Sequence, residues 1–392
     1  MISKKHTSSF FYFGTLLSSV GSMTLTISLI AFMLKSGFSL LQVSIIIGAS
    51  RFIPVIVSVV YGHKFDEYAP RKLIIWTEVL ASLASVLLFF NWQFFDKNYA
   101  LILLAMLLRV LFTSAQTGSR GQIAKVLSSE SYQSNSKNAI WLNKVTQGAT
   151  LFGGIIAWWA IEHSDFSTAI VFDAVTFITN GAILFFLPID QSGSQAATAQ
   201  SVPIFKKFTD LYHYNRWAEY LDVLLVLSMM GTSSFTARLA GKEEVWISLF
   251  VISFGLAVWL AGFVERVPFI QKQRVSLWVV LGVTLALLGT FKEPTPLMWA
   301  VCFVKDIAYW ILFHRITSHI QNDTPKELMA SVTFARTAQM ISIFAIGEVV
   351  VGLWKNTVSL ETECLLRAGV CLGAILLILA FGKREKNEKA YL

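Results

Sequence analysis

Ionisable and polar side chains recur at helical spacing inside otherwise apolar stretches of this chain. The clearest set is Arg109, Thr113, Gln116 and Arg120, which fall at i, i+4, i+7 and i+11 and therefore share one face of a helix. A charged group at membrane depth costs about 2.5–3.5 kcal/mol to insert, so it is expected to face a cavity or a partner. The pattern predicts the lining of a solute pathway. No nucleophile, metal cluster or acid pair accompanies it, so an enzyme is not expected.

Similar stripes and further basic groups complete the set of candidate solute-binding residues. These are Ser22, Thr26, Arg51, Arg109, Thr113, Gln116, Asn143, Lys144, Gln147, Lys305, Tyr309 and Arg336. Three cations of the first half, Arg51, Arg109 and Lys144, face one clear acid there, Asp173. This surplus of positive charge favours an anionic solute, because the guanidinium fork binds carboxylate or phosphate bidentately. The alternative is packing, with hydroxyls that let helices approach closely and arginines in structural ion pairs, for example between Arg109 or Arg51 and Asp173.

Proton coupling requires a group that gains and loses a proton, and a carboxyl in an apolar setting is the usual candidate. The candidates are Asp173, Asp222, Asp306 and Glu348. No cofactor and no metal are expected. The three cysteines have no metal-binding spacing and are interpreted as small buried hydrophobes.

Three local features carry expectations about packing. Lys305 and Asp306 are sequence neighbours, so on a helix their side chains diverge by about 100° and each is expected to have a different partner. Arg367, near the end of the last apolar stretch, is expected to extend its charged head toward the membrane surface. The Gly153-Gly154 pair is expected to mark a close helix contact.

The elements that hold these residues follow from composition. Only 14% of the 392 residues are charged, whereas a soluble globular chain carries about 25%, and the mean hydropathy is +0.61. A membrane-spanning helix needs roughly 20 mostly apolar residues. We therefore predict an all-α polytopic membrane protein with twelve transmembrane helices at 9–34, 39–62, 73–92, 99–119, 139–161, 168–188, 218–238, 243–264, 275–291, 296–315, 329–353 and 363–382.

Lysine and arginine set the predicted orientation. With both termini cytoplasmic, 20 of the 32 lie on the cytoplasmic side, six on the outer side and six within spans. The positive-inside rule favours this topology. It also accounts for the net charge of +8, so no nucleic-acid partner is expected. The apolar stretch after Lys4 and Lys5 is too long for a signal peptide and lacks a cleavage site, so it is interpreted as the first span.

A polar, low-complexity connection divides the spans six and six. It contains QSGSQAATAQS and predicts a cytoplasmic linker at 190–216, between an N-terminal six-helix bundle at 1–189 and a C-terminal one at 217–392. The chain has no phosphate-binding loop of the form GxxxxGK[ST] and no loop large enough for an ATPase domain. This layout favours a secondary transporter.

The loop after the second predicted span reads GHKFDEYAPRK. It resembles the cytoplasmic signature of the major facilitator superfamily, in which an aspartate follows a glycine by four residues and a basic pair comes next. The resemblance implies that superfamily's twelve-helix fold, alternating access and a monomer. It also implies a conformational latch formed by Gly62, Asp66, Arg71 and Lys72. Glu67, Ala69 and Pro70 depart from the Arg, Gly and Arg that the signature usually carries at these positions.

Two further stretches are similar to the enterobactin-exporter and macrolide-efflux branch of that superfamily. They read SAQTGSRGQIAKVLSSESYQSNSKNAIWLNKVTQGATLFGG and FDAVTFITNGAILF. The resemblance implies export of a small metabolite across a bacterial inner membrane, and a carboxylate siderophore fits both the branch and the predicted anionic solute. The branch commonly carries an antiport-associated Gly-Pro before the Gly-Gly of span five. Here Ala149 and Thr150 precede Gly153-Gly154, so proton antiport is left open.

Three alternatives remain from the sequence. The chain could import the same class of solute, since alternating access is symmetric in principle. It could be a broad multidrug efflux pump whose 31 Phe and 12 Trp line a drug pocket, although the basic groups at depth argue against a pocket for cations. A membrane enzyme or receptor is the third alternative, disfavoured because no catalytic motif occurs and the connections are short.

Overall fold

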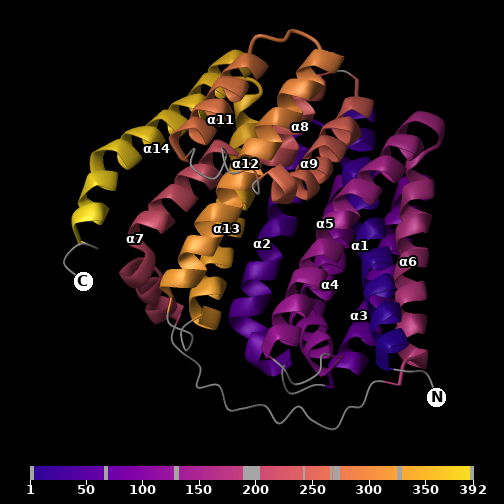
Figure 1. Ribbon diagram of the computed structural model, residues 1–392. Helices are drawn as coiled ribbons and strands as arrows, with labels where there is room; N and C mark the ends of the chain where they lie inside the picture. Colours follow the sequence, from indigo (N-terminus) through magenta and orange to yellow (C-terminus); the bar gives the residue numbers. More distant parts are fainter. Residues whose placement is uncertain are drawn as a thin grey trace. The chain divides into compact units, whose positions relative to one another are not determined.

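The computed structural model describes residues 4–65, 69–127, 132–188, 204–241, 243–264, 267, 274–324 and 329–388. These residues form α-helices and no strands (Figure 1). In chain order the helices are α1 (Lys4–Lys35), α2 (Leu40–Phe65), α3 (Pro70–Phe94), α4 (Tyr99–Leu127), α5 (Tyr132–His163), α6 (Phe166–Phe186), α7 (Ile204–Ser228), α8 (Thr232–Ala240), α9 (Val245–Val264), α11 (Arg274–Leu288), α12 (Pro296–Asp323), α13 (Met329–Trp354) and α14 (Leu360–Glu388).

Helices occur at every predicted span. Among the described residues, ten segments are long and apolar enough to cross a membrane, Val275–Leu288 is a shorter apolar helix, and α5 lies at the fifth predicted span. The predicted all-α polytopic fold is therefore confirmed. The seventh span differs in form, because it is divided between α7 and α8. α7 also begins at Ile204, so residues 204–216 of the predicted linker are helical.

Local sequence determines where several helices begin. The Asp165 side chain accepts a hydrogen bond from the Thr168 N–H at 3.1 Å and caps α6. Thr295 does the same for α12 through the Met298 N–H at 3.1 Å, and Pro296 occupies the first helical position. Both arrangements are favourable, because the first N–H groups of a helix have no partner within it and proline has no N–H to satisfy.

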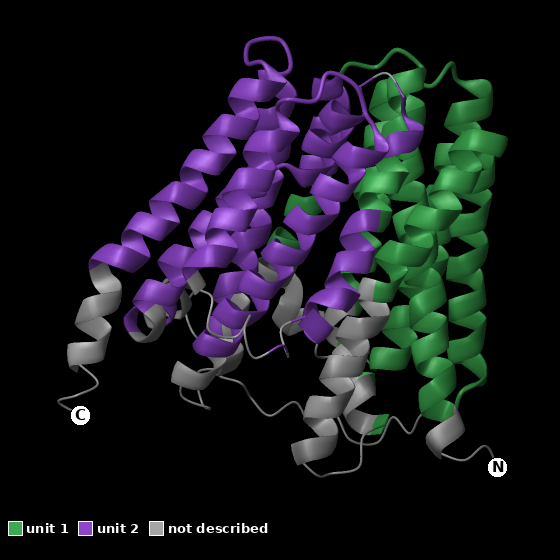
Figure 2. Cartoon of the chain, turned by 45° about the horizontal axis from the view of Figure 1, so that its top comes forward, with its two compact units in different colours: residues 1–39, 49–201, 247–252 green, residues 40–48, 202–246, 253–392 purple. Residues whose placement is uncertain are grey.

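The chain packs as two compact units, which Figure 2 shows in different colours. Unit 1 consists of residues 1–39, 49–201 and 247–252, and unit 2 of residues 40–48, 202–246 and 253–392. Within unit 1, α1 packs against α5 and α6, and α3 packs against α4 and α6. Within unit 2, α7 packs against α12, α13 and α14. The bundle boundaries predicted from sequence stay a prediction, since residues 189–203 lie outside the described part of the chain.

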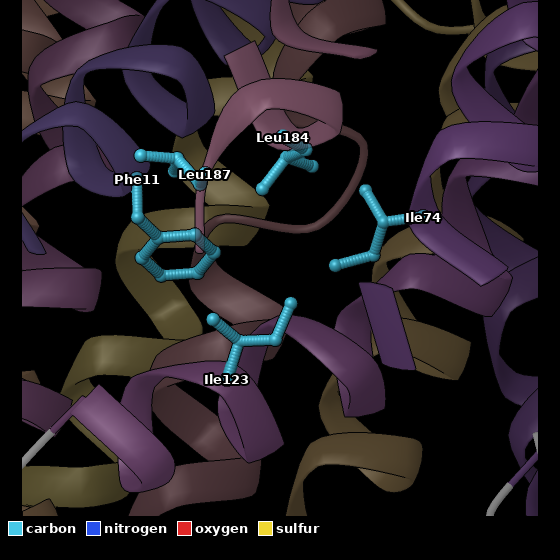
Figure 3. Close-up of a cluster of buried hydrophobic side chains, with 5 residues drawn as sticks. All are labelled: Phe11, Ile74, Ile123, Leu184 and Leu187. Atoms are coloured by element: carbon cyan, nitrogen blue, oxygen red, sulfur yellow. The ribbon is translucent and has the colours of Figure 1, made fainter. Parts of the chain in front are cut away.

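Apolar side chains are divided between the inside and the outside of the helices. Phe11, Ile74, Ile123, Leu184 and Leu187 form a buried cluster in unit 1 (Figure 3). Other large apolar side chains are exposed along whole helix faces, including Trp76, Leu83 and Phe90 on α3. A soluble protein rarely exposes continuous apolar faces of this kind, so these faces are expected to contact lipid.

Two adjacent glycines bring α5 close to its neighbours within unit 1. A Cβ atom at Gly153 would lie 2.6 Å from the Cβ of Met23 on α1, and the Thr24 hydroxyl donates to the Gly153 carbonyl at 3.3 Å. A Cβ atom at Gly154 would lie 2.9 Å from Ile252 Cγ1. Only a residue without a side chain fits at these contacts, as expected from the sequence for this glycine pair.

Candidate functional site

The first buried charge pair joins α4 to α6 in unit 1. Arg109 donates from Nε to Asp173 Oδ2 at 2.9 Å and from Nη2 to Asp173 Oδ1 at 2.7 Å. The Ser85 hydroxyl on α3 donates to the same carboxylate at 2.7 Å, and the guanidinium lies 5.2 Å from the centre of the Phe177 ring. Arg109 is 3% exposed and Asp173 is fully buried. The structure thus brings a predicted solute-binding residue and a predicted proton-coupling residue together as a bidentate ion pair.

A second polar network surrounds Glu78, a fully buried acid on α3 that is absent from the sequence-predicted site. Arg120 Nη2 lies 3.1 Å from Glu78 Oε1, and the Ser18 hydroxyl on α1 donates to both carboxylate oxygens at 3.2 and 3.3 Å. The Asn180 amide on α6 also donates to Glu78 Oε1. The sequence signal for this network is an acid in an apolar stretch, one helix away from the basic end of the α4 stripe.

Two hydrogen-bond donors of this network have no acceptor among the described residues. Arg120 Nη2 donates to Gln116 Oε1 at 2.6 Å, but neither Gln116 Nε2 nor Arg120 Nε has a hydrogen-bond partner in the described part of the chain. Gln116 is fully buried, whereas the Arg120 side chain is 17% exposed. Both residues belong to the predicted stripe on α4. The stripe therefore presents two buried, unoccupied N–H donors beside a guanidinium that is partly accessible.

The hydroxyl residues of the predicted site are half-buried and bond mainly within their own helices. Thr113 donates to the Val110 carbonyl at 3.2 Å, and Thr26 donates to the Ser22 carbonyl at 2.8 Å. Ser22 is also half-buried. These contacts fit the packing alternative as well as they fit a lined pathway, so the role of these residues in binding stays a prediction.

Several predicted positions are only partly described. Arg51 on α2 is half-buried and takes part in polar or electrostatic interactions. Asn143, Lys144 and Gln147 lie on α5, but their side chains fall outside the described residues. Their predicted role in the site stays a prediction.

Of the predicted latch, the structure describes the side chains of the basic pair, Arg71 and Lys72. Arg71, at the start of α3, donates from Nε to the Leu184 carbonyl at 2.9 Å and from Nη2 to the Phe185 carbonyl, both in the last turn of α6. A cation is favourable there, because the C-terminal end of a helix carries partial negative charge. Lys72 is exposed. Asp66 and the surroundings of Gly62 lie outside the described residues, so the latch as a whole stays a prediction.

A charge pair of the same geometry joins α13 to α7 in unit 2. Arg336 donates from Nε to Asp222 Oδ2 and from Nη2 to Asp222 Oδ1, both at 2.8 Å. The guanidinium lies 5.1 Å from the centre of the Phe313 ring, on which the predicted site residue Tyr309 also stacks, with ring centres 6.2 Å apart. Glu219, one helical turn before Asp222, is fully buried beside this pair and is absent from the sequence-predicted site.

Lys305 and Asp306 pair with each other, so the expectation that they have different partners is wrong. Lys305 Nζ lies 2.8 Å from Asp306 Oδ1, and the Ser253 hydroxyl on α9 donates to Asp306 Oδ2 at 3.1 Å. Both side chains are buried in unit 2. The long, flexible lysine side chain can bend around the helix to reach its neighbour, and pairing is favoured because a buried charge requires a counter-charge.

The break between α7 and α8 is stabilised by Glu348, the last of the predicted proton-coupling candidates. Its carboxylate accepts hydrogen bonds from the Ser233 N–H at 3.1 Å, the Ser234 N–H at 2.8 Å and the Ser234 hydroxyl at 2.7 Å. Gly231, with φ of +62°, makes the turn and packs on the Gly347 carbonyl. Glu348 therefore acts as the N-terminal cap of α8, supplied by a different helix.

Arg367 binds the other side of the break, so the expectation that it extends to the membrane surface is wrong. It is 2% exposed, and it donates to the Ser228 carbonyl at 3.1 Å and the Met230 carbonyl at 2.8 Å. Glu363 accepts from it at 2.6 Å. The free carbonyls at the end of α7 provide the acceptors that hold this guanidinium inside unit 2.

The pairings change the charge of the predicted pathway. Arg109 is neutralised by Asp173, Arg120 by Glu78, Lys305 by Asp306 and Arg336 by Asp222. The predicted surplus of the first half already counts Asp173 against Arg109 and depends on Arg51 and Lys144; the Lys144 side chain lies outside the described residues, so the surplus stays a prediction. At the four neutralised pairs, an anionic solute would have to be recognised by specific donors and not by net charge.

Comparisons with known proteins agree with this architecture. The sequence profile of the Major Facilitator Superfamily matches residues 11–348. No curated protein matches the chain. Among solved structures, the nucleoside transporter NupG is similar with a TM-score of 0.68 at 14% identity, covering 96% of this chain and 99% of that one. A POT family transporter in complex with a thioalcohol-conjugated peptide gives a TM-score of 0.74 at 12% identity, with 96% of each chain covered. A POT family transporter in complex with 5-aminolevulinic acid gives 0.71 at 11%, also with 96% of each chain covered.

Proposed function

Since the chain belongs to the Major Facilitator Superfamily, and is thus a membrane transporter and not an enzyme, we propose that it exports a small organic anion by alternating access. The proposed cargo is a carboxylate-bearing metabolite such as a siderophore, and proton antiport is the proposed driving reaction. The proposed location is the bacterial inner membrane with both termini cytoplasmic, which the distribution of Lys and Arg favours. The proposed working form is a monomer.

The observation that carries the proposal is the pair of unoccupied donors at Gln116 Nε2 and Arg120 Nε. A buried donor without a partner is destabilising by about 1–3 kcal/mol, so this pair is poised to donate to a ligand oxygen. The two residues are one helical turn apart on α4, and Arg120 Nη2 donates to Gln116 Oε1 at 2.6 Å, so we infer that one carboxylate group can bind both donors. The partly exposed Arg120 side chain supports access from outside the protein.

The ion pair of Arg109 and Asp173 supports the coupling of an anion to a proton. Arginine stays charged at physiological pH, so a buried Arg109 always needs an anion beside it. Asp173 supplies that anion when it is ionised. If Asp173 takes up a proton, a solute carboxylate can replace it at Arg109, and the total charge of the buried group is the same before and after the exchange.

The first test is metabolite profiling of cells and medium with the gene present or deleted, under iron-limited growth. The proposal expects an anionic metabolite to accumulate inside deleted cells and to be missing from their medium. The same metabolite left unused in the medium of deleted cells would make the protein an importer. No change in either compartment would favour a broad multidrug pump and count against the siderophore.

The second test asks whether the unoccupied donors bind the metabolite so identified. Gln116→Met removes the amide donors at similar volume and is expected to weaken apparent affinity about 10-fold or more, the loss of one hydrogen bond to a charged group. Ser114→Ala, on α4 but outside the predicted binding residues, removes a hydroxyl that donates to the Val110 carbonyl of its own helix and serves as the control. Equal affinities for Q116M, S114A and the unaltered protein in liposomes would overturn the assignment of this binding group.

A further inference from the structure

Glu219 is a buried acid whose carboxylate has no hydrogen-bond partner. It lies on α7 one turn before Asp222, at i and i+3, so both acids occupy the same face of the helix. Glu219 is fully buried, and within the described part of the chain neither Oε1 nor Oε2 accepts a hydrogen bond. Every oxygen of the Asp222 carboxylate, in contrast, is bound by the Arg336 guanidinium.

The groups that surround Glu219 do not neutralise a negative charge on it. The neighbouring group on α7 is a second acid, Asp222, and Arg336 on α13 already binds that acid bidentately. Burial raises the pKa of the nearby Tyr212 hydroxyl, which donates to Gln339 Oε1 at 2.9 Å and stays neutral. Tyr309 on α12 interacts electrostatically with Arg336. On α14 the buried Arg367 binds Glu363 and the carbonyls at the C-terminal end of α7.

One guanidinium is thus shared by two acids and can bind only one of them bidentately. An ionised carboxylate that is buried with neither hydrogen bonds nor a counter-charge is strongly unfavourable, and such a group takes up a proton instead. Asp222 keeps its charge through Arg336. Glu219 is left as the acid that must be neutral in this arrangement.

We propose that Glu219 is a proton-binding residue of the transporter, protonated while Arg336 is bound to Asp222. When the O–H bond of Glu219 breaks, the proton passes to water and the new carboxylate competes with Asp222 for the Arg336 guanidinium. Proton binding at Glu219 is thereby linked to the contact between α7 and α13. The link between this proton and solute movement rests on the proposed function, whereas the presence of the proton does not.

The test is infrared difference spectroscopy of the purified full-length protein in lipid nanodiscs, recorded between neutral and alkaline pH without any solute. The proposal expects the carbonyl stretching band of a protonated carboxylic acid at neutral pH, lost at alkaline pH and absent from Glu219→Gln. The glutamine is a neutral isostere of the protonated acid, so E219Q is expected to fold. Glu162→Gln, at an exposed position, is the matched control and should keep the band.

A second variant tests the competition for Arg336. Asp222→Asn removes the ionised acid and leaves Glu219 as the nearest anion for the guanidinium, so Glu219 should ionise and the neutral-pH band should weaken or vanish. Absence of the band from the unaltered protein, its persistence in E219Q, or an unchanged band in D222N would each overturn the proposal. Because no solute is used, a protein that shows the band yet transports no anion would contradict the proposed function and leave the proton site in place.

Discussion

Arg367 and Glu348 bind opposite sides of one helix break, and each brings the charge that its side requires. Arg367 binds carbonyls of Ser228 and Met230 at the C-terminal end of α7, where the helix dipole is negative. Glu348 binds N–H groups at the first turn of α8, where the dipole is positive. A break at membrane depth is tolerated only where its backbone groups find partners, and these two side chains supply them within unit 2.

Arg367→Met should therefore destabilise the protein strongly. The change leaves carbonyls of the break without their donor and leaves Arg238 as the one cation bound to Glu363 among the described residues. Removal of one partner of a buried pair costs about 3–5 kcal/mol. Arg367→Lys keeps the charge but lacks the planar fork, so an intermediate loss is expected. The measurement is the thermal unfolding midpoint followed by tryptophan fluorescence. Lys355→Met, at an exposed position, is the control and should stay within about 0.5 kcal/mol of the unaltered protein. If R367M has the same thermal unfolding midpoint as K355M, Arg367 does not stabilise the break.

Any side chain at Gly231 should destabilise the protein. Two substitutions there distinguish close contact from backbone strain as the cause. Its φ of +62° disfavours alanine by about 1–2 kcal/mol, but asparagine adopts this conformation readily. A Cβ atom of either residue would collide with the Gly347 carbonyl. Close contact predicts that Gly231→Asn and Gly231→Ala lower the unfolding midpoint alike, whereas backbone strain alone predicts that asparagine is accepted. Gly37→Asn is the control for positive φ in open space, because Gly37 has φ of +89° and a Cβ atom there would have no neighbour within 4 Å.

The sequence predicted the spans and the polar face of α4 because each depends on a local rule. Lipid requires roughly 20 apolar residues for each helix, and a 3.6-residue period places Arg109, Gln116 and Arg120 on one side. No local rule of this kind predicts which side chain a buried charge pairs with. Arg109 and Asp173 are 64 positions apart, and only the packing of both α4 and α6 against α3 decides that they meet. The sequence could therefore offer the pairing of Arg109 with Asp173 only as one of two alternatives.

The break between α7 and α8 and the role of Glu219 were missed for different physical reasons. The stretch LSMMGTSS contains no proline, and glycine is frequent inside membrane helices, so Gly231 alone did not indicate a break. The break is stabilised by side chains of α13 and α14. Glu219 did have a signal, because an acid three residues before Asp222 shares its helix face. What the sequence could not show is that one guanidinium satisfies Asp222 and leaves Glu219 without a partner among the described residues.

A double-mutant cycle should show that Arg109 and Asp173 are needed together. Arg109→Met leaves Asp173 buried with only the Ser85 hydroxyl, and Asp173→Leu leaves Arg109 without its counter-charge, so each is expected to cost about 3–5 kcal/mol. The double variant removes both charges and should lose less than the sum of the single losses, by about 2 kcal/mol or more. Thermal midpoints and expression of folded protein provide the readout. Additive losses would mean that the pair does not act as a unit.

Arg71 should stabilise the end of α6, which is the part of the predicted latch that can be tested directly. Arg71→Ala removes two hydrogen bonds to the Leu184 and Phe185 carbonyls, and a hydrogen bond to a charged group contributes about 1.5–3 kcal/mol. Amide hydrogen exchange at the C-terminal end of α6 should therefore become at least about 10-fold faster in R71A, because local opening there costs less free energy. Lys72→Ala, at the exposed neighbouring position, should leave this exchange unchanged. If R71A also slows transport of the metabolite found by profiling while K72A does not, the contact acts as a latch in the cycle. Faster exchange with unchanged transport would instead assign Arg71 to the stability of α6 alone.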